Sequence, residues 1–140
     1  MKFLLDTNPC IVYLNGRSFV LRQRLDAEDD SNIAVCSIVL AEMSYGATKS
    51  SAPEKTLQKQ LEFISRFKCL SFDNNAAALY GPIRAKLELA GATVGAHDLL
   101  IASIAIANDL VLVTHNTREF LRISELKVED WQTDDVDIVG

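Results

Sequence analysis

Features that would place this chain in a membrane or an oxidising compartment are absent from its sequence. The three cysteines, Cys10, Cys36 and Cys69, are odd in number and form no CxxC pair, which argues against a disulfide framework. No charged start followed by a long apolar core marks a leader. The longest uncharged apolar stretch, residues 99–107, is far shorter than the ~20 residues that a membrane-spanning helix needs. We therefore expect a soluble protein of a reducing compartment such as the bacterial cytoplasm.

The sequence also lacks an internal repeat, a linker and a cluster of His and Cys at zinc-ligand spacing. Its 140 residues suffice for one domain that folds without disulfides. We predict that residues 1–131 form this domain and that residues 132–140 are a poorly ordered acidic tail. His97 and His115 have no partner at zinc-ligand spacing, so we expect both to be neighbours of a site, with structural roles.

Acidic residues outnumber basic ones, which gives a net charge of −5. At first sight this negative charge argues against a nucleic-acid partner. The acids are concentrated, however: nine of the 19 fall in two groups, which leaves 10 acids against 14 Lys and Arg. One group is a candidate site described below. The other lies near the C-terminus: Glu129, Asp130, Asp134, Asp135 and Asp137. The rest of the chain is therefore mildly basic.

Short apolar runs alternate with helical patterns. Residues 3–5, 33–36 and 110–113 lack polar alternation, which is typical of strands buried on both faces of a parallel sheet, and residues 70–72 and 126–128 indicate two further strands. We expect Gly46 and Gly91 to end helices and Pro82 to kink or break one. The helical patterns lie at residues 9–14, 19–25, 38–45, 54–67, 74–90 and 99–107. This alternation predicts an α/β fold with a mainly parallel sheet.

Four acids lie where one edge of this sheet is predicted. Asp6, Glu42 and Glu119 follow the three apolar strands, and Asp98 opens the helix at residues 99–107. Because the carboxyl ends of parallel strands meet at one edge, we expect these carboxylates to gather there. Such a cluster repels itself, and Mg²⁺, or alternatively Mn²⁺, bound by carboxylates and water would relieve the repulsion. A site of this kind can hydrolyse phosphodiester bonds.

Each acid also has a purely structural interpretation. Asp6 and Asp98 could cap helices, Glu42 could be a charge of a first helical turn, and Glu119 could pair with a neighbouring arginine. A small phosphatase with an aspartate nucleophile is a further alternative. Phosphatases of the haloacid-dehalogenase type need a second Asp two positions after the first, and this chain has Asn8 there. Four acids at one edge therefore favour the metal site.

Other residues are candidates for supporting roles. Small polar residues at the same edge could bond to the acids or to metal-bound water: Thr7, Asn8, Thr114 and Asn116. Basic residues could follow an RNA backbone, although each could equally belong to a solvated helix face: Lys49, Arg84, Lys86 and Arg118. Two apolar helix stripes, at residues 57–64 and 79–87, are by default core, and one could line a partner groove.

At this point the motifs resemble those of a known family, the PIN domains, and more closely the VapC toxins of bacterial VapBC toxin–antitoxin pairs. The similarity extends from residue 1 to about Trp131, and the motifs occur in the family's order and spacing. They are Leu4-Leu5-Asp6-Thr7-Asn8, Ser37 through Leu40-Ala41-Glu42 with Tyr45-Gly46, Asp98-Leu99-Leu100-Ile101-Ala102, and Thr114-His115-Asn116-Thr117-Arg118-Glu119-Phe120.

The resemblance implies a three-layer α/β/α sandwich around a mainly parallel sheet of about five strands. It implies a Mg²⁺-dependent endoribonuclease with Asp6, Glu42 and Asp98 as the acidic triad, while Glu119 replaces the Asp that many PIN domains have as the fourth acid. Relatives of this pattern cleave tRNA, including the anticodon stem-loop of initiator tRNA, and so inhibit translation.

The resemblance also implies partners. They are a VapB-type antitoxin that neutralises the toxin, operator DNA bound only through that antitoxin, and a second toxin copy in a homodimer and in larger toxin–antitoxin assemblies. The alternative within the same family is a non-catalytic PIN-like module that binds antitoxin or RNA without cutting.

Overall fold

The computed structural model describes residues 1–132, and its centre is a parallel sheet. Within these residues the sheet has five strands in the order β3-β2-β1-β4-β5, and every neighbouring pair is parallel. The strands are β1 (Phe3–Leu5), β2 (Ile33–Cys36), β3 (Lys68–Leu70), β4 (Val111–Val113) and β5 (Val128–Glu129). The predicted α/β fold with a parallel sheet is confirmed. All five carboxyl ends therefore lie at the same edge.

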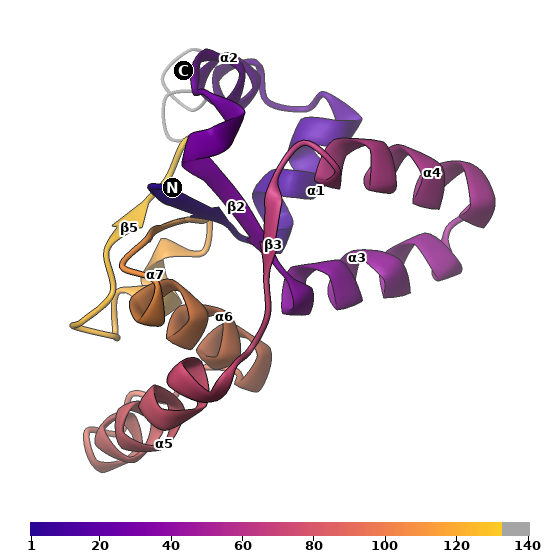
Figure 1. Ribbon diagram of the computed structural model, residues 1–140. Helices are drawn as coiled ribbons and strands as arrows, with labels where there is room; N and C mark the ends of the chain where they lie inside the picture. Colours follow the sequence, from indigo (N-terminus) through magenta and orange to yellow (C-terminus); the bar gives the residue numbers. More distant parts are fainter. Residues whose placement is uncertain (133–140) are drawn as a thin grey trace.

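Helices connect the strands and cover the sheet on both faces, so the predicted three layers are present (Figure 1). Helix α3 packs against α4 in a hairpin that extends away from the sheet, whereas α5 packs against α6. The helices are α1 (Thr7–Asn15), α2 (Phe19–Ala27), the short 3₁₀ helix η1 (Asp30–Asn32), α3 (Ser37–Lys49), α4 (Pro53–Ile64), α5 (Asn74–Leu89), α6 (Ala96–Ala107) and α7 (Thr117–Phe120).

Two helix boundaries differ from the prediction. Helix α3 does not end at Gly46 but continues to Lys49, where Ala47 is buried and tertiary packing outweighs the low helix propensity of glycine. Helix α5 is not broken at Pro82. Pro82 and the residue one turn before it, Ala78, both lie on the exposed face, where water can bind the carbonyl group that proline leaves without a donor.

The core lies on both sides of β1. Phe3, Leu4 and Leu5 are each at most 1% exposed, which explains why this strand has no polar alternation. Burying side chains of this size contributes about 1.5–3 kcal/mol each to folding. Phe3 also packs edge-on against Trp131, with ring centroids 5.0 Å apart. The first strand and the end of the described chain are thereby held together.

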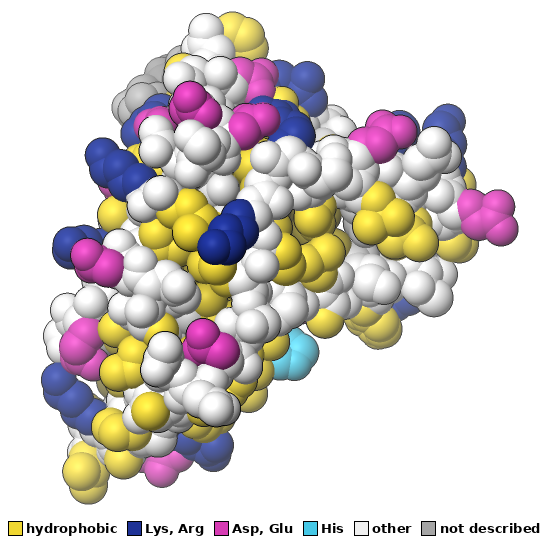
Figure 2. All heavy atoms as spheres, in the orientation of Figure 1, with side chains coloured by type: hydrophobic (Ala, Val, Ile, Leu, Met, Phe, Trp, Pro, Cys, Tyr) yellow, Lys and Arg dark blue, Asp and Glu magenta, His cyan; other side chains and the backbone are white. Residues whose placement is uncertain are grey.

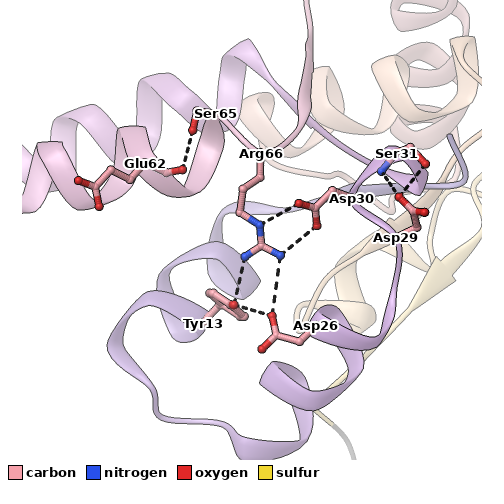
Figure 3. A network of polar contacts seen from close by, with 8 residues as sticks. All are labelled: Tyr13, Asp26, Asp29, Asp30, Ser31, Glu62, Ser65 and Arg66. Atoms are coloured by element: carbon pink, nitrogen blue, oxygen red, sulfur yellow. Dashed lines mark hydrogen bonds and ion pairs between the residues drawn. The ribbon is translucent and has the colours of Figure 1, made fainter.

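An arginine cluster joins four segments beside the sheet (Figure 3). The Arg66 guanidinium donates two hydrogen bonds to Asp30, of 3.2 and 3.0 Å, and a third of 3.1 Å to the Tyr13 hydroxyl. The Tyr13 hydroxyl in turn donates to Asp26 at 2.6 Å. The turn after α4 is thus tied to α1, to the end of α2 and to η1.

The surface carries mixed charge. On the face shown in Figure 2, acidic and basic side chains alternate with exposed apolar ones. Among residues 1–132, no helix is long and apolar enough to cross a membrane. The three cysteines are free, with Cys10 and Cys36 buried and Cys69 exposed. Of the predicted tail, residues 133–140 lie outside the described part, while Gln132 is buried and bonded to Asn8.

Candidate active site

Asp6 is the first residue after the central strand β1, and its side chain is almost fully buried, with 6% of the residue exposed. Its backbone N–H donates to the Val113 carbonyl at 2.9 Å, which continues the pairing of β1 with β4. Thr114, the residue after β4, donates its hydroxyl to Asp6 Oδ2 at 2.7 Å. Burial raises the pKa of Asp6, and the Thr114 hydrogen bond opposes that rise. Asp6 precedes α1 but its side chain makes no capping hydrogen bond, so a structural cap does not account for it.

Glu42 lies in the second turn of α3 and is held by the first residue of α1. Thr7 donates its hydroxyl to Glu42 Oε1 at 2.7 Å. The other carboxylate oxygen, Oε2, lies 3.7 Å from His97 Nδ1. Helices α1 and α3 thus orient this carboxylate toward the edge where Asp6 lies.

Asp98 lies in the first turn of α6, whose N-cap is Gly95, so Asp98 is not the cap that its sequence position allowed. Its pKa is raised to about 6, first by burial and then by the negative charges of Asp6, Glu119 and Glu42. These charge effects require the four carboxylates to be near neighbours. The prediction that they gather at one edge therefore has direct support in the electrostatics of Asp98.

Glu119 lies in the short helix α7 and is fixed at both oxygens. The backbone N–H of Gly95 donates to Oε1 at 2.6 Å, and the Asn116 amide donates to Oε2 at 3.0 Å. These two hydrogen bonds are the main causes that lower the pKa of Glu119. Among residues 1–132, no ion pair joins Glu119 to an arginine, although the more distant charge of Arg122 also helps to lower the pKa of Glu119. We call Asp6, Glu42, Asp98 and Glu119 the four-acid site.

The donor chemistry of the four-acid site fits a hard divalent cation. Carboxylate oxygens are the preferred ligands of Mg²⁺ and Mn²⁺, and the raised pKa of Asp98 indicates negative charge in excess. In the described part of the chain, no three Asp, Glu, His or Cys side chains are already arranged as a metal site. Glu119 accepts protein hydrogen bonds at both oxygens, and Glu42 lies between the Thr7 hydroxyl and His97, whereas Asp6 accepts one side-chain hydrogen bond, from Thr114. Asp6 and Asp98 are consequently the residues best able to bind an ion directly, since Mg²⁺ commonly takes one or two carboxylates and several waters.

Three of the four predicted polar neighbours bond directly to the acids. Thr7 binds Glu42, Thr114 binds Asp6, and Asn116 binds Glu119. Asn8 differs, because its side-chain oxygen accepts a hydrogen bond from Gln132 at 2.9 Å. Asn8 therefore ties Gln132, three residues after the end of β5, to the edge of the sheet.

The four predicted RNA-contacting residues are all exposed and lie on three different helices, α3, α5 and α7. Arg118 precedes Glu119 in α7 and is the one adjacent to the four-acid site in sequence. Lys49 lies at the end of α3, with its ammonium 4.9 Å from the Tyr45 ring centroid. Arg84 and Lys86 on α5 form ion pairs with acids: Glu88 at 2.9 Å and Glu125 at 3.1 Å.

Two groups at the site were not singled out from the sequence. The first is the backbone N–H of Gly95, which binds Glu119; a glycine-rich loop before Asp98 was the available signal. The second is Asp130, which follows β5 and lies 3.0 Å from His115 Nδ1, whereas the sequence assigned it only to an acidic C-terminal group. Each of these two contacts joins segments that are separate in the sequence, so periodicity within one segment does not reveal it.

Known proteins share this architecture and these motifs. The PIN-domain profile matches residues 3–126. The chain is 44% identical to the tRNA(fMet)-specific endonuclease VapC of Salmonella typhimurium and 41% identical to ribonuclease VapC2 of Rickettsia felis, covering 94% of this chain and 98% of each relative.

Solved structures of similar proteins have the same fold as this chain. A DNA-bound VapBC from Salmonella typhimurium superposes with a TM-score of 0.88 at 44% identity, covering 94% of this chain and 98% of that one. VapBC2 from Rickettsia felis, bound to a DNA fragment from its promoter, gives a TM-score of 0.87 at 40% identity, with 94% and 99% covered. The chain belongs to the PIN-domain family and, within it, to the VapC ribonucleases.

Proposed function

We propose that this VapC ribonuclease is the Mg²⁺-dependent endoribonuclease toxin of a toxin–antitoxin pair, with Mn²⁺ as an alternative ion. The observation that carries the proposal is the four-acid site, in which Thr114, Thr7 and Gly95 orient three of the carboxylates at the carboxyl edge of the sheet. Burial, and then the charges of Asp6, Glu119 and Glu42, raise the pKa of Asp98 there. Asp6 and Asp98 would hold the ion, which when bound would supply polarisation of a water molecule and neutralisation of charge on the phosphoryl oxygens.

The residues of this chain then have separate roles. Asp6 and Asp98 hold the ion. Thr114 fixes the orientation of Asp6, and Thr7 fixes that of Glu42. Hydrolysis adds the water oxygen to phosphorus and breaks the bond from phosphorus to one ribose oxygen, which leaves protonated.

The substrate that we propose is tRNA, with the anticodon stem-loop of initiator tRNA as the specific target. Support comes from the relatives of Salmonella typhimurium and Shigella flexneri, at 44% and 40% identity, both named tRNA(fMet)-specific endonucleases. Cleavage there would stop translational initiation, which is the toxic effect.

Cleavage of total tRNA by the purified chain tests this proposal. Discrete fragments should appear with Mg²⁺, and should disappear with EDTA or in Asp6→Asn. The matched control is Asp109→Asn, because the Asp109 side chain is 93% exposed and lies before β4, at the opposite edge of the sheet. Intact RNA with folded, antitoxin-free wild-type protein would support the non-catalytic binding module instead. Comparing initiator with elongator methionine tRNA then tests the specific target.

We further propose a VapB-type antitoxin as the protein partner, with operator DNA bound only through it and a toxin homodimer within the larger assembly. Both DNA-bound relatives are VapBC complexes. An apolar groove of about 350 Å³ between α3 and α4 is a suitable surface, since Leu57 and Leu61 there are 40% and 53% exposed. Leu61→Asp should weaken antitoxin binding while leaving tRNA cleavage intact, as measured by calorimetry with the antitoxin encoded beside this chain.

A further inference from the structure

A cavity of about 180 Å³ lies beside Gly95, whose backbone N–H binds Glu119 of the four-acid site. Its walls come from α5, the loop of residues 91–95 and the first turn of α6. Ala96 and Leu99 line it and stand on either side of Asp98 in the sequence. Val94, also in the wall, precedes Gly95, whose N–H binds Glu119. Glu119 is therefore bound by a residue that lies between two cavity-lining residues, and Asp98 precedes a third, Leu99, in the sequence.

The size and lining of this cavity fit one planar ring system. Pockets for drug-sized ligands have volumes of about 300–1,000 Å³, so this one is too small for such a ligand. The Tyr80 ring forms part of the wall, and Phe72 packs edge-on against it with centroids 6.3 Å apart, which limits its rotation. The Arg84 guanidinium lies 6.0 Å from the Tyr80 centroid. Aromatic rings and guanidinium planes are the groups on which unpaired RNA bases stack.

Polar groups at the mouth of the cavity can bind the edge of such a ring. Arg84 donates to Glu88 Oε1 at 2.9 Å and to the Tyr80 hydroxyl at 3.2 Å. The Arg84–Glu88 pair is more than half exposed, so it is weak and can rearrange at little cost. The Glu88 carboxylate could then accept a hydrogen bond from an exocyclic amino group, as carboxylates do when they contact cytosine.

The loop between the cavity and the four-acid site is fixed at both ends. Arg122 donates to the Thr93 carbonyl at 2.6 Å, and the N–H of Ala92 donates to the Leu87 carbonyl at 2.9 Å. At the other end, Gly95 donates to Glu119. A ligand in the cavity would therefore be held at a defined position relative to Glu119 and Asp98.

We propose that this cavity binds one unpaired base of the RNA substrate, next to the phosphodiester bond that is cleaved. Tyr80 and Arg84 stack on the base, and Glu88 reads its edge. This inference rests on the proposed function, because it takes RNA as the substrate of the four-acid site. Only an unpaired base can leave its stack and enter the cavity, so a base site there would favour cleavage in RNA loops.

Direct nucleotide binding tests the cavity independently of catalysis. The four ribonucleoside 5′-monophosphates are titrated in EDTA into the ¹⁵N-labelled wild-type protein, with ribose 5-phosphate as the control for the sugar and phosphate. At least one nucleotide should cause saturable amide shifts at Thr93, Val94 and Ala96, and ribose 5-phosphate should not. Tyr80→Ala should abolish these shifts, and Tyr80→Phe, which keeps the ring, should retain them. Unmoved amides with all four nucleotides would overturn the base site, even if the protein cleaves tRNA normally.

Cleavage kinetics supply the second test. Tyr80→Ala should lower kcat/KM for tRNA about 5- to 100-fold, mainly through a higher KM, because stacking of one base on an aromatic side chain has an effect of this size. Tyr80→Phe should stay near wild type. Arg84→Met is compared with Lys127→Met, which also removes a cation paired with an acid but lies before β5, at the opposite edge of the sheet. Equal losses in both would indicate general attraction of RNA and would contradict a base site. Failure of the wild type to cleave any RNA would refute the proposed function and leave the nucleotide titration to decide on the cavity.

Discussion

The Thr114 hydroxyl donates a 2.7 Å hydrogen bond to Asp6 Oδ2, across 108 residues of sequence. The two residues follow β1 and β4, which are adjacent and parallel, so strand pairing alone brings them together. Both are buried, and the bond therefore fixes one oxygen of Asp6.

Thr114→Val should lower tRNA cleavage about 10- to 100-fold, the usual effect of removing a partner of a metal-binding carboxylate. Valine keeps the shape of threonine but leaves Asp6 without its donor. Rates measured across a Mg²⁺ series should show that more Mg²⁺ is needed for half-maximal activity. Thr48→Val serves as the control, since Thr48 is exposed near the end of α3. An unchanged Mg²⁺ requirement in Thr114→Val would show that Asp6 is oriented by other contacts.

Asp98→Asn should stabilise the metal-free protein at pH 7.5 but not at pH 4. The pKa of Asp98 is raised to about 6 in the folded state, and unfolding returns it to about 3.9. Between these two pH values the folded protein binds more protons than the unfolded one, so the free energy of unfolding falls as pH rises. The full destabilisation by the ionised Asp98 carboxylate is present above about pH 6.

At pH 7.5 we expect Asp98→Asn to increase the free energy of unfolding by about 1–2 kcal/mol. This is less than the full pKa shift implies, because Asp98 is partly exposed. Urea unfolding in EDTA at both pH values measures it. An equal effect of the substitution at pH 4 and pH 7.5 would mean that the charge of Asp98 is not the cause.

Glu119→Gln distinguishes the effect of the Glu119 charge from the effect of its hydrogen bond with the Gly95 N–H. Glutamine can still accept the hydrogen bond from the Gly95 N–H, so the loop of residues 91–95 should stay in place. We expect at least about tenfold slower cleavage and no loss of thermal stability, because repulsion with Asp98 is also removed. If Glu119→Gln cleaves tRNA at the wild-type rate, then the charge of Glu119 is not needed for cleavage and its role is to hold the loop.

Arg66→Met should reduce the free energy of unfolding by about 1–3 kcal/mol. The substitution removes the hydrogen bonds to Asp30 and Tyr13 that join the turn after α4 to α1 and η1, as Figure 3 shows. Urea unfolding of Arg66→Met and Lys86→Met gives the comparison, because the Lys86 pair with Glu125 is exposed and should contribute at most about 1 kcal/mol. Similar losses in both variants would show that the cluster adds no more than a surface pair.

The sequence by itself determined the three central strands and singled out the four acids, for reasons that lie in short segments. Residues 3–5 and 33–36 are uninterrupted apolar runs because both of their faces are buried, and this pattern can be read without a fold. Once those strands are known to be parallel, Asp6 and Glu42 must lie at their carboxyl edge. Strand β3 was placed less accurately, at residues 70–72 instead of Lys68–Leu70, because Lys68 and Cys69 are exposed at the edge of the sheet and carry no apolar signal.

Only the tertiary structure decided how the acids are held and which helix signals prevail. Thr114 reaches Asp6, Gly95 reaches Glu119 and Gln132 reaches Asn8, each across long separations in sequence. Pro82 does not break α5, because it lies on the exposed face of that helix, and α3 continues past Gly46, because packing outweighs local propensity. A hydrogen bond between distant residues depends on how strands and helices meet in space, and hydrophobic periodicity within one segment carries no information about that meeting.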